Sequence, residues 1–137
     1  MRHLETFGPA MPELVYRRAR HVITENGRVI EFVKACEAKD LERMGRTFRE
    51  SHESLRHDYE VSCEELDFLV ETALAMPAVF GARMTGGGFG GCTVNLVAPQ
   101  AAADFKSAIA RKYEERFGTA PAVYDCHPSA GAGEMQF

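Results

Sequence analysis

The stretch GARMTGGGFGGCTVNLV, residues 81–97, constrains the fold more than any other part of the sequence. Six of its first eleven residues are glycine, and glycine in a helix interior costs roughly 1 kcal/mol relative to alanine. The runs on either side, AVFGARMT and CTVNLVA, are short and contain β-branched or aromatic residues. This pattern predicts a strand, a glycine-rich loop and a second strand.

Helical periodicity dominates the sequence before the first predicted strand. Between Pro12 and Ala38 apolar residues recur at steps of three, four and seven, which predicts one long amphipathic helix with a bend or break at Gly27. Pro99 opens a further helix, which Gly118 ends. The expected helices span about 13–38, 40–57, 63–76 and 100–117, the expected strands about 78–84, 92–98 and 122–127, and a loose tail about 128–137.

Local signals mark two of the helix starts. Asp40 is placed to cap the second helix. In VSCEEL, Ser62 and Glu65 have the spacing of a capping box, and Val61 is placed to pack on Leu66 as a hydrophobic staple.

The order of these elements is three helices, two strands, a helix and a strand. It indicates an α+β fold with a mostly antiparallel sheet and helices packed on one face. The length of 137 residues suits one domain and leaves no room for a second.

Composition narrows the classes of function. A net charge of −4 argues against nucleic-acid binding, and the basic run VYRRARH at residues 15–21 is interpreted as a solvated helix face in preference to an anion site. The sequence has no apolar run long enough to span a membrane and no signal-peptide pattern at its start, so neither a membrane nor secretion is expected. The four cysteines, Cys36, Cys63, Cys92 and Cys126, form no C-x-x-C pair, which favours reduced thiols in a cytoplasmic protein.

The glycine run matches known phosphate-binding motifs only in part. Gly86, Gly88 and Gly91 form a G-x-G-x-x-G, but a strand follows them where the dinucleotide-binding motif requires a helix. The P-loop lysine is absent, and the remaining protein-kinase motifs do not occur. Two interpretations stay open at this point: a loop whose backbone approaches an anion, and a hairpin loop that packs under a helix.

The histidines near residue 55 do not form a metal motif. His52 and His57 are five residues apart, which places them roughly 140° apart around a helix, whereas a zinc-binding pair shares one face. No metal site is therefore predicted. The acidic residues nearby are interpreted as helix-start charges: Asp58, Glu60, Glu64 and Glu65.

Three stretches together resemble one family. RRARHVITEN at 17–26, SHESLRHDYEVSCEELDFLVETAL at 51–74 and the glycine-rich stretch at 81–97 are similar, in order and separation, to the C-terminal part of galactokinases, which are GHMP small-molecule kinases. The similarity extends from about Val15 to Gly131. His57 departs from the family, which usually has aspartate there.

The resemblance implies a function for the glycine loop. It implies ATP-dependent phosphorylation of galactose at the anomeric hydroxyl with Mg²⁺, in the cytoplasm, with this loop on the phosphate side of the nucleotide cleft. The loop residues are Gly86, Gly87, Gly88, Phe89, Gly90 and Gly91. The resemblance assigns no chemical step to Arg83, His52 or His57.

The resemblance also implies what this sequence lacks. The family's sugar-binding segment, ATP loop and catalytic aspartate precede its C-terminal domain, so no catalytic residue is expected in this chain, and the chain alone is expected to be inactive. The family domain is ferredoxin-like, and its first, central strand also lies upstream. Its loss predicts self-association through open strand edges and exposed apolar helix surface. Two alternatives remain: a kinase for a related sugar such as N-acetylgalactosamine, and a non-catalytic module that senses a nucleotide or sugar.

Overall fold

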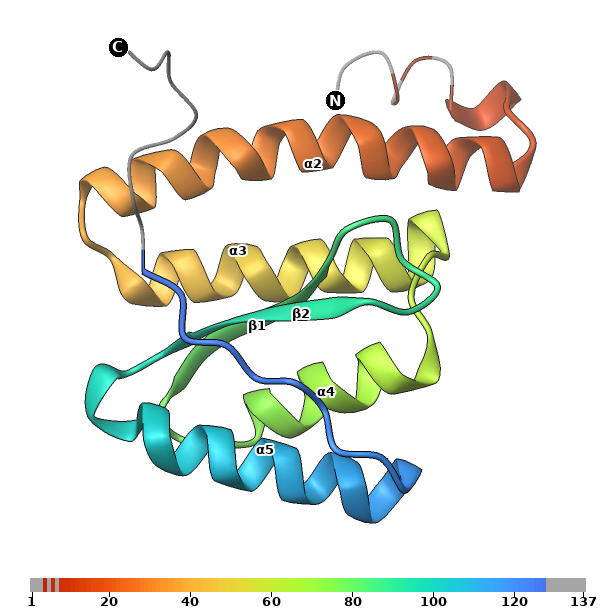
Figure 1. Ribbon diagram of the computed structural model, residues 1–137. Coiled ribbons are helices and arrows are strands. Elements are labelled where there is room, and N and C mark those ends of the chain that lie inside the picture. Colours follow the sequence, from red (N-terminus) through yellow and green to blue (C-terminus); the bar gives the residue numbers. More distant parts are fainter. Residues whose placement is uncertain (1–3, 5, 7, 128–137) are drawn as a thin grey trace, which may run out of the picture.

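The structure is a computed structural model that describes residues 4, 6 and 8–127 (Figure 1). Its elements in chain order are η1 (Gly8–Ala10), α2 (Glu13–Glu37), α3 (Leu41–Ser54), η2 (Leu55–Tyr59), α4 (Glu64–Leu74), β1 (Val79–Thr85), β2 (Cys92–Val97), η3 (Pro99–Ala101) and α5 (Ala102–Phe117). No helix within the described residues combines the length and apolar character needed to cross a membrane. The α+β class predicted from the element order is confirmed.

The long helices form where the sequence predicted them, with differences at their ends. The long first helix, α2, runs from Glu13 to Glu37 without a break, so the break predicted at Gly27 does not occur. An added Cβ at Gly27 would meet no atom within 4 Å. The second predicted helix ends earlier, at Ser54, and continues as the π-helical turn η2.

Two capping predictions have different outcomes. The Asp40 carboxylate accepts a hydrogen bond from the Arg43 backbone N–H at 3.0 Å, as predicted. The predicted capping box was wrong, because Cys63 is the N-cap residue of α4 and makes no side-chain cap bond. Ser62 lies one position too early and donates its hydroxyl to Asp67 at 2.5 Å.

Strands β1 and β2 form an antiparallel hairpin that carries the glycine loop. The ladder runs from Val79 opposite Val97 to Thr85 opposite Cys92, with one irregularity between Val79 and Gly81. The loop therefore begins directly where the ladder ends. This is the strand, loop and strand arrangement predicted from the sequence.

Helices α4 and α5 cover one face of this hairpin (Figure 1). Their apolar side chains bury Ala82 of β1 in a core that contains Val70, Ala73, Phe105 and Ile109. A second cluster at the loop end of β1 contains Leu55, Leu66 and Met84, with Val61 packed against it. Burying such apolar side chains is the main term that holds the hairpin on the helices.

Helix α3 packs along β1 through backbone contact. An added Cβ at Gly81 would lie 2.5 Å from the Gly45 Cα, and one at Gly45 would overlap the Phe80 carbonyl. Side chains of α3 also bond the β1 backbone: Arg49 donates to the Phe80 carbonyl at 2.5 Å, and His52 Nδ1 accepts from the Met84 N–H at 3.3 Å. Polar groups of β1 thus have partners on α3 as well as on β2.

The strand predicted at 122–127 is not formed. In the described residues the sheet has two strands, β1 and β2, and 122–127 pairs with neither. Val123 instead packs against the core cluster that contains Ala82, Val70 and Phe105. A strand requires a ladder partner as well as a suitable sequence, and this segment has none. The tail predicted at 128–137 lies outside the described residues.

Candidate functional site

The glycine loop adopts a backbone that ordinary residues avoid. Positive φ angles occur at Gly86 (85°), Gly88 (84°), Phe89 (59°), Gly90 (131°) and Gly91 (100°). Glycine reaches these angles without the steric cost that a Cβ imposes. Four of the five glycines in the loop are therefore required by its conformation.

The tip of the loop is fixed to the segment between η2 and α4. The Phe89 N–H donates to the Val61 carbonyl at 2.8 Å. A Cβ added at Gly88 would lie 2.8 Å from the Val61 Cβ and closer still to the Val61 carbonyl oxygen. Close backbone approach therefore requires glycine at position 88 in addition to its positive φ.

Gly87 differs from its neighbours. Its φ is not positive, and an added Cβ would meet no atom of the described chain within 4 Å. Neither the conformation nor the packing of the chain requires glycine at this position. The free space over Gly87 leaves room for something outside the chain to approach the backbone.

The loop surrounds an open pocket of about 560 Å³, lined by residues 85–92. Phe89 stands at its rim with 77% of its surface exposed, and Cys92 is also exposed. Gly87 lies between two glycines of positive φ, and changes in the sign of φ also occur in backbone nests that bind anions. The backbone at Gly87 is therefore accessible from outside the described chain.

His52 supports the strand that leads into the loop. Its side chain is 2% exposed, and its Nδ1 accepts from the backbone N–H of Met84, two residues before Gly86. Nε2 lies 3.3 Å from an Asp67 carboxylate oxygen, although the angle is too poor for a hydrogen bond. Burial lowers the pKa of His52 and outweighs the opposing effect of Asp67. The ring is therefore neutral near pH 7, with its proton on Nε2.

Arg83, on β1, contacts helix α2. Its guanidinium lies 3.1 Å from the Glu25 carboxylate, which also accepts from Ser51 at 2.6 Å and from Arg28 at 2.8 Å. The hydrogen bonds and charges of these partners lower the pKa of Glu25 despite its burial. Arg83 is thus part of an ion-pair cluster that joins α2, α3 and β1, and it does not line the loop pocket.

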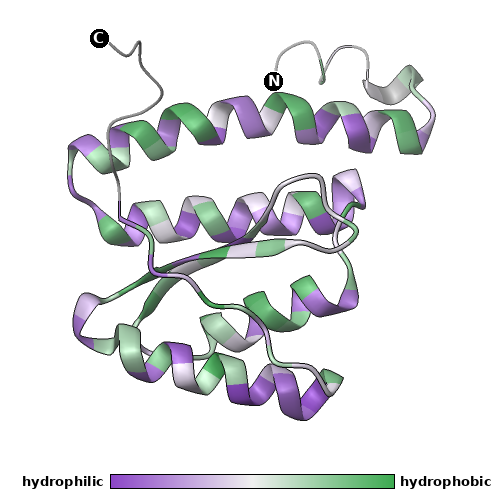
Figure 2. Cartoon of the chain, in the orientation of Figure 1, coloured by the Kyte–Doolittle hydropathy of each residue, from purple (hydrophilic) through white to green (hydrophobic). Residues whose placement is uncertain are grey.

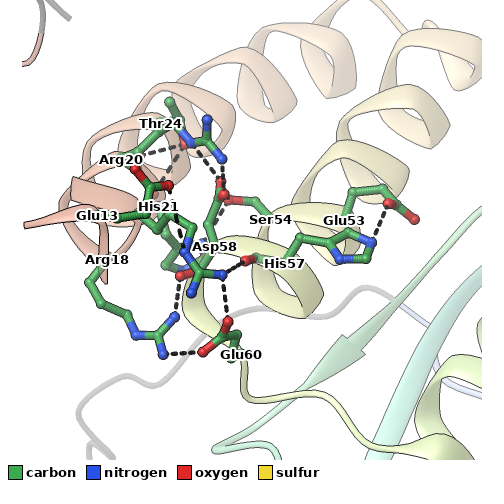
Figure 3. Close-up of polar contacts among 11 residues, drawn as sticks. Glu13, Arg18, Arg20, His21, Thr24, Glu53, Ser54, His57, Asp58 and Glu60 are labelled. Atoms are coloured by element: carbon green, nitrogen blue, oxygen red, sulfur yellow. Dashed lines mark hydrogen bonds and ion pairs between the residues drawn. The ribbon is translucent and has the colours of Figure 1, made fainter. Parts of the chain in front are cut away.

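The basic run of α2 is paired with one acidic residue of η2 and with the acidic residue that follows it (Figure 3). Arg17 and Arg18 each donate to one oxygen of the Glu60 carboxylate at 2.5 Å. Arg20 pairs with both oxygens of Asp58, which also accepts from Ser54 at 3.0 Å. The interpretation of residues 15–21 as a merely solvated face was therefore wrong for these arginines.

These ion pairs also correct the interpretation of the acidic residues. Asp58 and Glu60 bind arginines of α2 and do not act as start charges of α4, whereas Glu64 and Glu65 do lie in the first turn of that helix. Asp58 is buried, and its bonds to Arg20 and Ser54 lower its pKa despite burial. His57 lies 3.2 Å from Glu53 at the surface, apart from His52. The described residues hold no group of three or more histidine, cysteine or acidic side chains placed to bind a metal ion.

Sequence reasoning identified the loop but missed its supports. The Val61 carbonyl and His52 Nδ1 hold the loop and its leading strand, and neither contact has a sequence signal, because each joins residues 28 or more positions apart. The repeated glycines were the only local feature of the sequence that indicated close approach of another backbone segment, here at Val61, to this loop.

Comparison with known proteins defines the class. Residues 32–115 match the family described as GHMP kinases C terminal. This match covers more than half of the chain and includes α3, the loop hairpin and most of α5. The chain belongs to the GHMP kinase family, as its C-terminal domain.

Its relatives in this family are galactokinases. The chain is 43% identical over 125 residues to the galactokinase of Roseiflexus sp. (strain RS-1), covering 91% of this chain and 32% of that protein. It is 48% identical over 116 residues to the galactokinase of Streptococcus thermophilus, covering 85% of this chain and 30% of that protein.

A solved structure agrees with these sequences. Lactococcus lactis galactokinase, crystallised with galactose, superposes with a TM-score of 0.78 at 42% identity, covering 85% of this chain and 31% of that one. The chain therefore spans about a third of the length of the galactokinases it matches.

Proposed function

We propose that this chain is the C-terminal part of a cytoplasmic galactokinase, which phosphorylates galactose to galactose 1-phosphate with ATP and Mg²⁺. In this proposal the loop from Gly86 to Gly91 forms the wall of the cleft on the side of the nucleotide phosphates. Family membership and the identity to named galactokinases support it.

The main structural support for this site is the position of Gly87. Its glycine is required neither by φ nor by contacts within the described chain, whereas Gly86 has a positive φ and Gly88 has both a positive φ and close contact with Val61. A phosphate that approaches the backbone explains this glycine, because a Cβ would keep the anion away from the N–H groups. The ATP phosphates fit an open, glycine-lined pocket of this kind.

We do not assign the Mg²⁺ ligands or the catalytic residues to this chain. Within the described residues there is no acidic or histidine cluster for a metal ion. We therefore propose that the metal and the reacting groups are held by the rest of the enzyme and by the nucleotide, and that this chain alone does not turn over. Phosphoryl transfer depends on positioning and charge stabilisation, which one wall of a cleft does not supply.

A chimera tests this function. The matching C-terminal third of the Streptococcus thermophilus galactokinase is replaced by this chain, and ATP-dependent galactose phosphorylation is measured. We expect the chimera to be active, its Gly87→Val variant to lose most of its activity while remaining folded, and the isolated chain to be inactive. A folded but inactive chimera would contradict the proposal, and so would turnover by the isolated chain at a rate near that of the chimera.

Calorimetric titration of the isolated chain with ATP, Mg²⁺ and galactose separates two further outcomes. If none of these ligands binds, the result fits a loop that needs the rest of the enzyme to complete the nucleotide site. Tight binding without turnover would favour a sensing module instead.

A further inference from the structure

The glycine loop is attached to other segments of the chain at two points. At its tip, the Phe89 N–H donates to the Val61 carbonyl at 2.8 Å. On the strand that leads into the loop, the Met84 N–H donates to His52 Nδ1 at 3.3 Å. Val61 precedes α4, whereas His52 lies on α3. The position of the loop therefore depends on two separate segments that must keep their places relative to each other.

One carboxylate, that of Asp67 on α4, contacts both supports. Its Oδ1 accepts from the Ser62 hydroxyl at 2.5 Å, and the same oxygen lies 3.3 Å from His52 Nε2. Its Oδ2 lies 2.9 Å from Arg56 Nε. The Asp67 side chain is 18% exposed and His52 is buried, so water screens the contact between them only weakly. Asp67 thus joins α3, η2 and the segment before α4.

Ser62 connects Asp67 to the tip of the loop. Because the Val61 carbonyl belongs to the peptide bond with Ser62, holding the Ser62 side chain also restrains this carbonyl. The Val61 N–H is held separately, by a bond to the Leu55 carbonyl at 3.1 Å. Loss of the Asp67 carboxylate therefore frees one of the two peptides around Val61, the one that supplies the acceptor for the Phe89 N–H.

His52 connects Asp67 to the strand that leads into the loop. Because Nδ1 accepts from the Met84 N–H, the ring proton is on Nε2, which lies beside Asp67. Within the described residues Nε2 has no hydrogen-bond partner, and a buried N–H without one lowers stability. The negative charge 3.3 Å away offsets part of this loss and favours the tautomer that the Met84 N–H requires.

We propose that Asp67 is a positioning residue for the glycine loop, whose carboxylate holds the tip through Ser62 and the leading strand through His52. Asp67 does not line the loop pocket, so it acts through these two side chains. It also lies in the first turn of α4, where any carboxylate stabilises the helix, but that role alone predicts no selective effect on the loop. The attachment of the loop is independent of the proposed galactokinase function, whereas its effect on ATP binding rests on that function.

Amide hydrogen exchange, followed residue by residue by NMR, tests the proposal on this chain. In Asp67→Ala, the Met84 and Phe89 amides should both exchange about tenfold faster or more, relative to the amide of the core residue Ile109. The matched control is Glu71→Gln, which removes a second α4 carboxylate that contacts Arg56. In this control neither loop amide should change relative to Ile109.

Two further variants each remove one of the two contacts. Ser62→Ala should speed exchange at Phe89 alone. Asp67→Asn keeps an oxygen for the Ser62 hydroxyl but not the charge beside His52, so it should speed exchange at Met84 alone. These two variants decide the proposal where Asp67→Ala does not fold.

The proposal is wrong if Asp67→Ala speeds exchange at Met84, Phe89 and Ile109 equally, which is the result for a charge that only adds to overall stability. It is equally wrong if only one of the two loop amides responds to Asp67→Ala, or if Ser62→Ala and Asp67→Asn leave both amides unchanged.

The chimera described above gives a functional measurement. Under the proposed function, Asp67→Ala should raise the KM for ATP several-fold and leave the KM for galactose unchanged, because the loop lies on the side of the nucleotide phosphates. An unchanged KM for ATP in an active chimera would contradict the effect on ATP binding. An inactive unmodified chimera would contradict the proposed function instead, and the exchange rates would still decide the role of Asp67.

Discussion

Replacing Gly88 by alanine should release the glycine loop from the segment that holds it. Gly88 has a φ of 84°, and an added Cβ would lie 2.8 Å from the Val61 Cβ and closer to the Val61 carbonyl. Cβ atoms do not approach other heavy atoms within 3.0 Å, and the obstacle here is mainly backbone. The loop tip must therefore move away from Val61.

Two terms set the expected loss of stability. A left-handed conformation costs alanine about 1–2 kcal/mol relative to glycine. Losing the hydrogen bond from Phe89 to Val61 adds about 1 kcal/mol. The free energy of unfolding should therefore fall by about 2–3 kcal/mol in Gly88→Ala.

The adjacent glycine is the matched control. Gly87 has neither a positive φ nor a contact within 4 Å, so Gly87→Ala should change the free energy of unfolding by no more than about 0.5 kcal/mol. Urea and thermal unfolding of both variants measure the difference. For a domain of this size, the melting temperature of Gly88→Ala should be lower by on the order of 10 °C. Equal stability of the two variants would show that the loop is not held by Val61.

Three further predictions concern the rest of the fold. Gly45→Ala should destabilise the chain by at least about 3 kcal/mol in urea unfolding because its Cβ would overlap the β1 backbone. Gly27→Ala lies in open space on a helix and should stabilise the chain by about 0.5–1 kcal/mol in the same assay. Asp58→Asn should cost about 1.5–3 kcal/mol because the buried Asp58 carboxylate accepts hydrogen bonds from Arg20 and Ser54. Glu115→Gln, which breaks an exposed pair, should cost less than about 0.5 kcal/mol. Equal costs, measured by urea unfolding, would contradict the burial argument. Because burial lowers the pKa of His52, the unfolded chain binds a proton that the folded chain does not, so stability should fall as the pH drops below about 6.5. Melting temperatures from pH 7.5 to 5 should show this slope, and His52→Gln, which keeps an acceptor but does not titrate, should reduce it.

Several elements could be predicted because their causes are local. The periodicity of α2, the Asp40 cap, the positive φ of Gly118 after α5 and the hairpin around the glycines each depend on residues within a few positions. The capping box failed although its pattern was local, because Ser62 found a partner in Asp67 instead. Local competition between hydrogen-bond partners is decided by the final packing.

The predictions that were wrong concern residues whose structure depends on distant partners. The segment 122–127 has a strand-like sequence, but in the described chain it pairs with neither β1 nor β2. Asp58 and Glu60 looked like start charges of a helix, but arginines about 40 positions earlier bind them. Neither outcome was readable from the residues nearby.

The glycine-rich stretch shows where the boundary between sequence and tertiary structure lies. The sequence alone determined that residues 86–91 form a loop between two strands, because glycine permits positive φ and disfavours regular structure. Only the tertiary structure decided which glycine has which purpose: Gly88 makes room for Val61, and Gly87 faces open space. The physical reason is that conformational preference belongs to each residue, whereas close approach depends on which distant backbone the fold brings beside it.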